Sequence, residues 1–294
     1  MSDPLKDKVH LLHGGDVEIP EGYKNENITC HDGVPYSLVI AFEGTRIRKR
    51  ISDKGQFRLV EKDGKLSLLD NGKEFLDDIR ILKMYGHSPE TVTVSIFRRD
   101  RLLTVEEALE IMDSYEGMDP IKGITIHGGF GCPFDLYADV VSAYHQRYPQ
   151  YTIGVALPLP GDKGVNALKK AGASDFKTSV HDLEQFDDSI WKGLEYAVSI
   201  FGRGKVTCGV HMDRTAADGT IESIIERMCS IGVMPDIKVK RSKSTGVKEV
   251  PEECYCDILK KSKAAMERNG LTVEGYDTMC YGCRLCMVVP FKDF

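Results

Sequence analysis

The sequence lacks the long apolar runs that membrane proteins carry. None of its hydrophobic stretches approaches the roughly 18 apolar residues that a membrane-spanning helix needs. The first residues, MSDPLKDKVHLLHGG, also lack the apolar centre of a secretory signal peptide. We therefore expect a cytoplasmic protein with no membrane partner, in a compartment where thiols stay reduced. In that setting nine cysteines indicate metal ligands or core residues rather than disulfides.

The sequence is also short of positive charge. Its 39 lysine and arginine residues are outnumbered by 45 aspartate and glutamate residues, which gives a formal net charge of −6. Because nucleic-acid-binding domains usually present a basic surface, this balance argues against a nucleic-acid partner. One short basic cluster is present and is typical of a solvated loop; it comprises Lys238, Lys240, Arg241 and Lys243.

No low-complexity segment interrupts the 294 residues, and 41% of them are hydrophobic. The chain can therefore form one large domain, or a domain with a smaller appendage. Residues 1–88 are predicted to be rich in β-structure, with an apolar strand over 37–43 and a hairpin over 57–69 that turns at Asp63-Gly64. The segment 69–90 is predicted to contain a short helix followed by a linker.

From Thr91 onward the sequence alternates between apolar strands and amphipathic helices. Thr104 and Glu107 fit a capping box at the start of the first helix. Glycines that are expected to end later helices are Gly172, Gly202, Gly232 and Gly270. Strands are predicted at TVTVSIF (91–97), GITIH (123–127), YTIGVAL (151–157), DFKTSV (175–180), KVTCGVH (205–211) and PDIKVKR (235–241).

Six successive β-then-α units predict a parallel sheet with helices on its outside, because crossovers between parallel strands are right-handed. A TIM barrel has eight such units, so we predict an α/β fold with a partial (βα)6 TIM-like barrel over residues 89–270. Functional groups in this architecture lie at the C-terminal ends of the strands. A further strand, LTVEGY (271–276), is expected to carry the C-terminal segment, residues 271–294, to that face.

Three cysteines stand close together in the C-terminal segment, within CYGCRLC. Their CxxCxxC spacing matches the start of the bacterial ferredoxin pattern, but Pro290 stands where the fourth cysteine would be. A [4Fe–4S] cluster held by three cysteines leaves one iron open to a small chelating ligand. The competing interpretations are zinc, for which Cys254 and Cys256 would complete the ligand set, and simple packed thiols. The expected cluster ligands are Cys280, Cys283 and Cys286.

These features together are similar to those of the radical S-adenosylmethionine (radical SAM) superfamily. The resemblance rests on the six β/α units, the glycine-rich end of the second strand, ITIHGGFG (124–131), and the three-cysteine motif. It implies that S-adenosylmethionine (SAM) binds the open iron through its amino and carboxylate groups. Reductive cleavage of SAM would start radical chemistry on a small-molecule, biosynthetic substrate, with a low-potential flavodoxin or ferredoxin as the electron donor.

The sequence departs from most members of that superfamily, which carry CxxxCxxC after the first strand. Here the corresponding loop, RRDRLL (98–103), has no cysteine, the motif is one residue shorter, and Leu285 stands where an aromatic residue is usual. Thiamine pyrimidine synthase is similar in placing a C-terminal cysteine motif beside a barrel. The resemblance therefore includes a precedent for a relocated cluster motif.

The resemblance also assigns candidate contacts to SAM at the end of the second strand. Gly128, Gly129 and Phe130 correspond to the GGE turn of the family, whose backbone receives the SAM amino group. Two glycines after a strand let the backbone approach a ligand closely. The competing explanation of this pair is the geometry of the turn alone.

Four further residues are assigned to the cofactor by position. Ser179 and His181, at the end of the fourth strand, resemble positions that contact the ribose or carboxylate of SAM. Met212 lies in the fifth-strand region that packs near adenine. Arg284 lies inside the cysteine motif, where a cation would offset the charge of the cluster.

Three residues are candidates for catalysis. His127 and His211 end the second and fifth strands, where an imidazole could orient a carboxylate or transfer a proton; a hydrogen-bonded structural role is the alternative. Cys132 could donate a hydrogen atom or bind substrate, and its alternative is that of a small buried residue. The competing functions are a zinc-binding lyase or hydrolase, a non-catalytic binding module, and an electron carrier.

Overall fold

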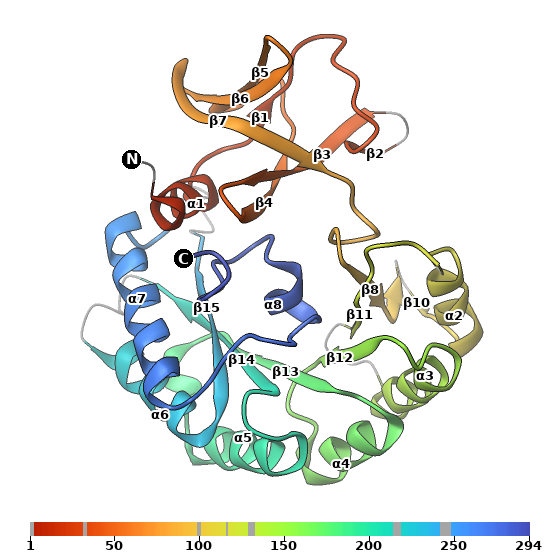
Figure 1. Ribbon diagram of the computed structural model, residues 1–294. Helices are drawn as coiled ribbons and strands as arrows, with labels where there is room; N and C mark the ends of the chain where they lie inside the picture. Colours follow the sequence, from red (N-terminus) through yellow and green to blue (C-terminus); the bar gives the residue numbers. More distant parts are fainter. Residues whose placement is uncertain are drawn as a thin grey trace.

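The computed structural model of the protein describes residues 3–31, 34–98, 101–115, 117–128, 133–213, 219–241 and 248–294. Figure 1 shows a β-rich N-terminal part above a β/α part, with the C-terminal segment between them. The predicted α/β fold, a partial (βα)6 barrel with a β-rich N-terminal region, is confirmed. Within the described ranges, no helix combines the length and the apolar composition that crossing a bilayer requires.

The N-terminal part is a mostly antiparallel sheet in the order β1-β5-β6-β7-β3-β2, with β4 also paired to β3. Apolar side chains such as Leu38, Phe57 and Leu68 form a core of their own on this sheet. Its strands are β1 (Val17–Glu18), β2 (Thr29–His31), β3 (Val34–Phe42), β4 (Thr45–Arg50), β5 (Phe57–Lys62), β6 (Lys65–Asp70) and β7 (Lys73–Leu82).

The helix predicted within 69–90 is wrong, because that segment contains strand β7. Asn71 and Gly72 have φ angles of 47° and 81°, and they form the tight turn of a β6–β7 hairpin. A register irregularity then interrupts the pairing, and Asp78 within it has φ 51°. This irregularity breaks the alternation of apolar residues that would have identified the strand.

A helix that the sequence analysis did not anticipate precedes the sheet: α1 (Pro4–His13). The Asp3 side chain accepts a hydrogen bond from the backbone N–H of Lys6 at 3.3 Å, and proline occupies the first turn. Leu5 and Val9 are buried, and α1 lies against α7.

The β/α part contains six parallel strands that follow one another across the sheet in sequence order. They are β8 (Thr91–Ser95), β11 (Gly123–His127), β12 (Thr152–Ala156), β13 (Asp175–Val180), β14 (Val206–Met212) and β15 (Val233–Val239). A hairpin of β9 (Phe97–Arg98) and β10 (Arg101–Leu102) follows β8. The outer helices are α2 (Val105–Asp113), α3 (Phe134–Arg147), α4 (Gly161–Ala171), α5 (Asp188–Phe201), α6 (Thr220–Ile231) and α7 (Glu252–Arg268), with a 3-10 turn, η1 (Leu183–Gln185).

Local sequence signals account for these boundaries. Thr104 and Glu107 form the predicted capping box at the start of α2. Gly172, in the left-handed region at φ 110°, ends α4. Pro235 lies inside β15 and is tolerated there because β15 is an edge strand, where a missing N–H breaks no ladder.

The barrel is open between β15 and β8, the two edges of the parallel sheet. In Figure 1 the N-terminal sheet lies across this opening, and the C-terminal segment, with helix α8 (Met279–Cys283), occupies the inner side of the barrel. The strand predicted over 271–276 is wrong. Leu271, Val273 and Tyr276 are buried there without strand pairing, and Gly275 makes a turn at φ 65°.

Candidate functional site

The C-terminal segment enters the barrel near the beginnings of the strands. At Gly123, at the start of β11, an added Cβ would lie 2.5 Å from the carbonyl oxygen of Asp277. At Gly154, in β12, an added Cβ would lie 2.4 Å from Oγ1 of Thr278. Both strands therefore use glycine where the segment crosses them at close range.

Buried polar contacts hold the segment in place as it rises. The Thr278 hydroxyl donates to Oδ2 of Asp175 at 3.0 Å, and the backbone N–H of Met279 donates to Oγ1 of Thr125 at 2.7 Å. Thr125 and Asp175 come from β11 and β13, so two strands of the barrel anchor the first turn of α8.

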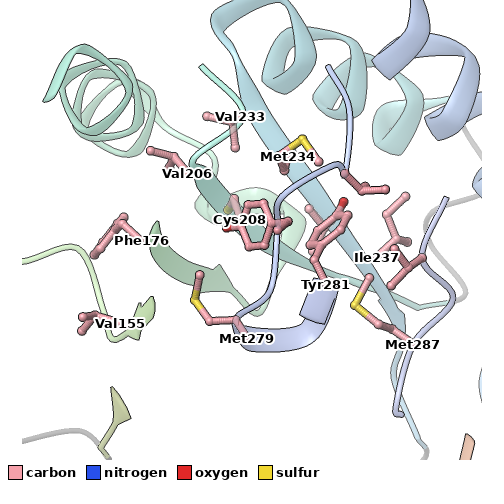
Figure 2. Packing of buried hydrophobic residues seen from close by; sticks show 14 of the residues in the cluster. Val155, Phe176, Val206, Cys208, Val233, Met234, Ile237, Met279, Tyr281 and Met287 are labelled. Atoms are coloured by element: carbon pink, nitrogen blue, oxygen red, sulfur yellow. The ribbon is translucent and has the colours of Figure 1, made fainter. Parts of the chain in front are cut away.

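Apolar side chains of the segment complete the core of the barrel. Figure 2 shows Met279, Tyr281 and Met287 facing Cys208 and other apolar side chains of the sheet. The Tyr281 hydroxyl donates to the carbonyl of Pro235 at 2.7 Å, so its polar end is satisfied. Each fully buried side chain of this size contributes about 1.5–3 kcal/mol relative to exposure.

The three motif cysteines face one cavity of about 630 Å³, which we call the cysteine cavity. It lies at the C-terminal ends of β11, β12 and β13, the edge at which parallel β/α sheets bind ligands. Cys283 is buried, Cys280 is half-buried, Cys286 is exposed, and all three are free thiols. The other lining residues include His87, His127, Gly128, Pro158, Lys177, Ser179 and His181.

Two lysines and one aspartate surround the Cys280 thiol. The Nζ of Lys177 lies 2.8 Å from Cys280 Sγ and also contacts the Asp236 carboxylate, while the Nζ of Lys238 lies 3.7 Å from the same sulfur. Burial alone would raise the pKa of Asp236, but the two ammonium groups outweigh it and lower that pKa. Burial would likewise lower the pKa of Lys177, but Asp236 and then Cys280 raise it. At neutral pH the group carries one net positive charge beside the sulfur.

The thiols also interact with one another. A hydrogen bond between Cys280 and Cys286 lowers the pKa of Cys286 to about 6, and the charge of Lys238 adds to this lowering. The same bond and burial raise the pKa of Cys280. Burial raises the pKa of Cys283 to about 11. The site therefore favours a thiolate among its three cysteines at neutral pH.

The three thiols of the cysteine cavity are compatible with the ligand set of a cluster. Across the described residues, no group of three or more His, Cys, Asp and Glu side chains converges closely enough to hold one metal ion. In a [4Fe–4S] cluster each thiolate binds a different iron, so the sulfurs surround the cluster and do not meet at one point. Three free thiols facing one cavity, with ammonium groups beside them, fit that requirement.

Several residues that the sequence assigned to the site lie together. His127, Gly128, Ser179 and His181 line the cysteine cavity. His211 packs on His181, with the ring centroids 4.6 Å apart. Burial first, and then the charge of Lys238, lowers the pKa of His211 to about 4, so its imidazole is neutral at physiological pH.

Two of the assigned residues lie elsewhere. The Arg284 guanidinium donates to Asp293 Oδ1 at 2.6 Å and to the Gly44 carbonyl at 2.7 Å, so it holds the C-terminal segment to the N-terminal sheet. Met212 lines a different cavity, of about 850 Å³, beside α1 and α7. Its side chain points there because it follows His211 along β14, and successive strand residues face opposite sides.

The remaining assigned residues fall into two groups. Gly129, Phe130 and Cys132 lie outside the residues that the structure describes. Cys254 is exposed beside the larger cavity and Cys256 is buried in α7. Neither belongs to a three-ligand group among the described residues.

Sequence reasoning missed the charged residues that surround Cys280. Lys177, Asp236 and Lys238 lie within the buried strands β13 and β15, where charged residues are rare unless paired. Charged residues within apolar strand segments could therefore have indicated a buried charged site from the sequence alone. The sequence pattern predicts a solvated loop around Lys238, and this prediction is wrong because Lys238 lies in β15 and its side chain reaches inward to Asp236 and Cys280.

Comparisons with known proteins bear on the fold only. No family model and no curated protein sequence matches the chain. The catalytic domain of a hyperthermophilic chitinase from Pyrococcus furiosus is similar in structure at 11% identity and a TM-score of 0.39, over 55% of this chain and 66% of that one.

Two further solved structures are similar at the same level. A 7,8-dihydropteroate synthase from Vibrio fischeri ES114 matches with 11% identity and a TM-score of 0.35, over 66% of this chain and 60% of that one. A dihydrodipicolinate synthase from Rhodopseudomonas palustris matches with 12% identity and a TM-score of 0.32, over 64% and 80%. These structurally similar proteins are enzymes, and the similarity concerns the fold alone.

Proposed function

We propose that this protein is a radical SAM enzyme that binds a [4Fe–4S] cluster through Cys280, Cys283 and Cys286. One observation carries the proposal. Three free thiols from a CxxCxxC motif line a single cavity at the carboxyl edge of a six-stranded β/α sheet. Three cysteine ligands leave the fourth iron of such a cluster without a protein ligand, which is what a chelating cosubstrate needs.

The chain's own residues have distinct roles in this proposal. When bound, the cluster would supply an electron to SAM, which would release methionine and a 5′-deoxyadenosyl radical. The ammonium groups of Lys177 and Lys238 offset the negative charge of the cysteine thiolates in a poorly hydrated site. Met279 and Tyr281 are buried and close the inner side of the barrel next to the motif.

The other wall of the cysteine cavity is suited to the cosubstrate. Gly128 offers an accessible backbone, Ser179 a hydroxyl group, and His127 and His181 ring nitrogens for a carboxylate or ribose. A volume of about 630 Å³ lies within the range of small-molecule sites. The proposed substrate is a small biosynthetic molecule, and the proposed electron donor is a flavodoxin or ferredoxin of the cytoplasm.

Anaerobic reconstitution tests the proposal. We expect the protein to become brown and to retain roughly four irons per chain, and dithionite with SAM should then release 5′-deoxyadenosine. Cys283→Ala should lose the cluster, whereas Cys254→Ala, which removes an exposed thiol that lines a different cavity, should retain it.

Two results would contradict the proposal. The first is a colourless protein that binds stoichiometric zinc through the same cysteines, which would favour a zinc-stabilised barrel. The second is an iron-loaded protein that neither binds nor cleaves SAM under any reductant.

A further inference from the structure

A second cavity, of about 590 Å³, adjoins the cysteine cavity on the side of the N-terminal sheet. We call it the basic cavity. Strand β4 forms one wall, the end of α1 and the turn after it form another, and Leu285 and Cys286 of the C-terminal segment complete it. Its charged lining residues are Asp16, Arg48, Lys49, Arg50, Arg241 and Lys248, with His87 at its border.

The charges around the basic cavity are unbalanced. Five of its lining residues are lysine or arginine, and Asp16 is the one carboxylate among them. The Nζ of Lys49 donates to the carbonyls of Leu11 and Gly14, at 2.7 and 3.1 Å. The Nζ of Lys248 donates to the carbonyl of Val239 at 2.9 Å. These ammonium groups are therefore held in place by backbone dipoles, and a full counter-charge would stabilise them further.

The surroundings of Lys49 and Lys248 disfavour the charged form of both lysines. Burial lowers the pKa of Lys49 to about 8, and the charge of Arg241 adds to the effect while Asp16 opposes it. Burial and Arg241 also lower the pKa of Lys248 to about 8. An anion bound between them would raise the pKa of both lysines, because an opposite charge favours the protonated form.

The basic cavity and the cysteine cavity share part of their walls. Cys286 and His87 line both of them. The backbone N–H of Arg48 donates to the carbonyl of Leu285 at 3.2 Å, which fixes β4 directly beside the cysteine motif. A molecule anchored on β4 would therefore extend past Cys286 toward the candidate cluster.

We propose that the basic cavity binds the anionic end of the substrate, a small molecule that carries phosphate or several carboxylate groups. The planar guanidinium groups of Arg48, Arg50 and Arg241 are suited to bidentate contacts with either group. The anionic end would lie on the N-terminal sheet, and the reacting end would lie in the cysteine cavity. Calling this ligand the substrate rests on the proposed function; the anion site itself does not.

Calorimetric titration of the full chain with two probes, inorganic pyrophosphate and citrate, tests the inference at low salt. We expect at least one probe to bind, in both the iron-free and the iron-loaded protein. Binding of pyrophosphate but not citrate would indicate a phosphorylated substrate. Binding of citrate but not pyrophosphate would indicate a substrate with several carboxylate groups. The double variant Arg48→Gln, Arg50→Gln should weaken binding by about tenfold for each lost charge-assisted bond.

Arg80→Gln is the matched control, because Arg80 is an exposed arginine on β7 of the same sheet and lies outside the cavity. Its affinity for the probe should equal that of the wild type. Absence of binding by both probes, or equal weakening in the Arg80 variant, would overturn the inference. Binding by a protein that never cleaves SAM would uphold the anion site while the proposed function fails.

Discussion

At the scale of single residues, Asp293 connects three parts of the chain. Its buried carboxylate accepts hydrogen bonds from Thr45 of β4 at 2.6 Å, Lys8 of α1 at 2.7 Å and Arg284 of the C-terminal segment at 2.6 Å. Lys8 and Asp293 are both fully buried at the side chain. Removal of one partner from such a pair leaves the other charge buried without compensation.

We therefore expect Asp293→Asn to lower the free energy of unfolding by about 3–5 kcal/mol, measured by chemical denaturation. Burial already lowers the pKa of Lys8 to about 8. Once its partner is neutral, the ammonium group would have neither water nor a carboxylate to stabilise its charge. Asp257→Asn, on the exposed face of α7, is the control and should change stability by less than about 0.5 kcal/mol. Equal losses in the two variants would contradict the role of Asp293.

His211 provides a pH-dependent prediction at the same scale. Burial, Lys238 and His181 lower its pKa to about 4 from the ordinary value of 6.5. The unfolded chain thus binds a proton at a pH where the folded chain does not. The stability contributed by neutral His211 is fully present above pH 6.5 and is lost progressively as the pH falls toward 4.

Unfolding free energies measured across this interval should fall less steeply in His211→Asn than in the wild type. Parallel profiles would show that His211 titrates normally in the folded protein.

Some residues of the cysteine cavity could be predicted from the sequence, and others could not. The motif spacing singled out Cys280, Cys283 and Cys286, and these three cysteines line one cavity in the structure because the residues of a short motif stay close together. The ammonium groups beside Cys280 belong to Lys177 of β13 and Lys238 of β15, which are distant from the motif in the sequence. Only the register of the sheet and the path of the C-terminal segment bring them together, so residue spacing could not reveal that contact.

At the scale of elements, the six strands and the outer helices followed from periodicity and capping signals. The two wrong elements failed for separate reasons. Strand β7 is irregular at Asp78, so its apolar residues do not alternate regularly. In residues 271–276 apolar and polar side chains do alternate, because Leu271 and Val273 are buried, but the segment pairs with no strand. Periodicity reports which side of a segment is buried, and it reports pairing only when a partner strand is available.

The close crossing of β11 by the C-terminal segment gives an element-scale prediction. Gly123→Ala places a methyl group 2.5 Å from the Asp277 carbonyl, which must move, so we expect destabilisation by about 1–3 kcal/mol. Displacement of the segment should also increase the rate at which the motif thiols react with a thiol reagent.

Gly193→Ala is the matched control, because this residue lies inside helix α5 and meets only the flexible Leu159 side chain, at 3.2 Å. Alanine favours the helix there, and stability should be unchanged or higher. If Gly123→Ala behaves like Gly193→Ala, the segment does not pack on β11 as described.

At the scale of the whole molecule, the C-terminal segment joins the two sheets. Arg46 of β4 donates to the carbonyls of Cys283 at 3.1 Å and Gly282 at 2.6 Å, and it pairs with Glu90 near the start of β8. Ligand binding at the motif should therefore stabilise both sheets together, since only the folded segment presents the three thiols.

We expect the iron-loaded protein to unfold at a higher temperature than the iron-free protein, in one cooperative transition. Scanning calorimetry of the two forms measures this, and removal of iron by a chelator should restore the lower value. A rise confined to one of two separate transitions would show that the segment does not couple the sheets.

The position of the C-terminal segment inside the barrel has a consequence for biosynthesis. Translation produces strands β8 to β15 before the residues that fill their concave side, including Met279, Tyr281 and Met287. The nascent chain therefore exposes an apolar hollow until residues 276–289 have left the ribosome, and such a state is prone to aggregation. Maturation of the protein is thus expected to depend on chaperones that shield this hollow.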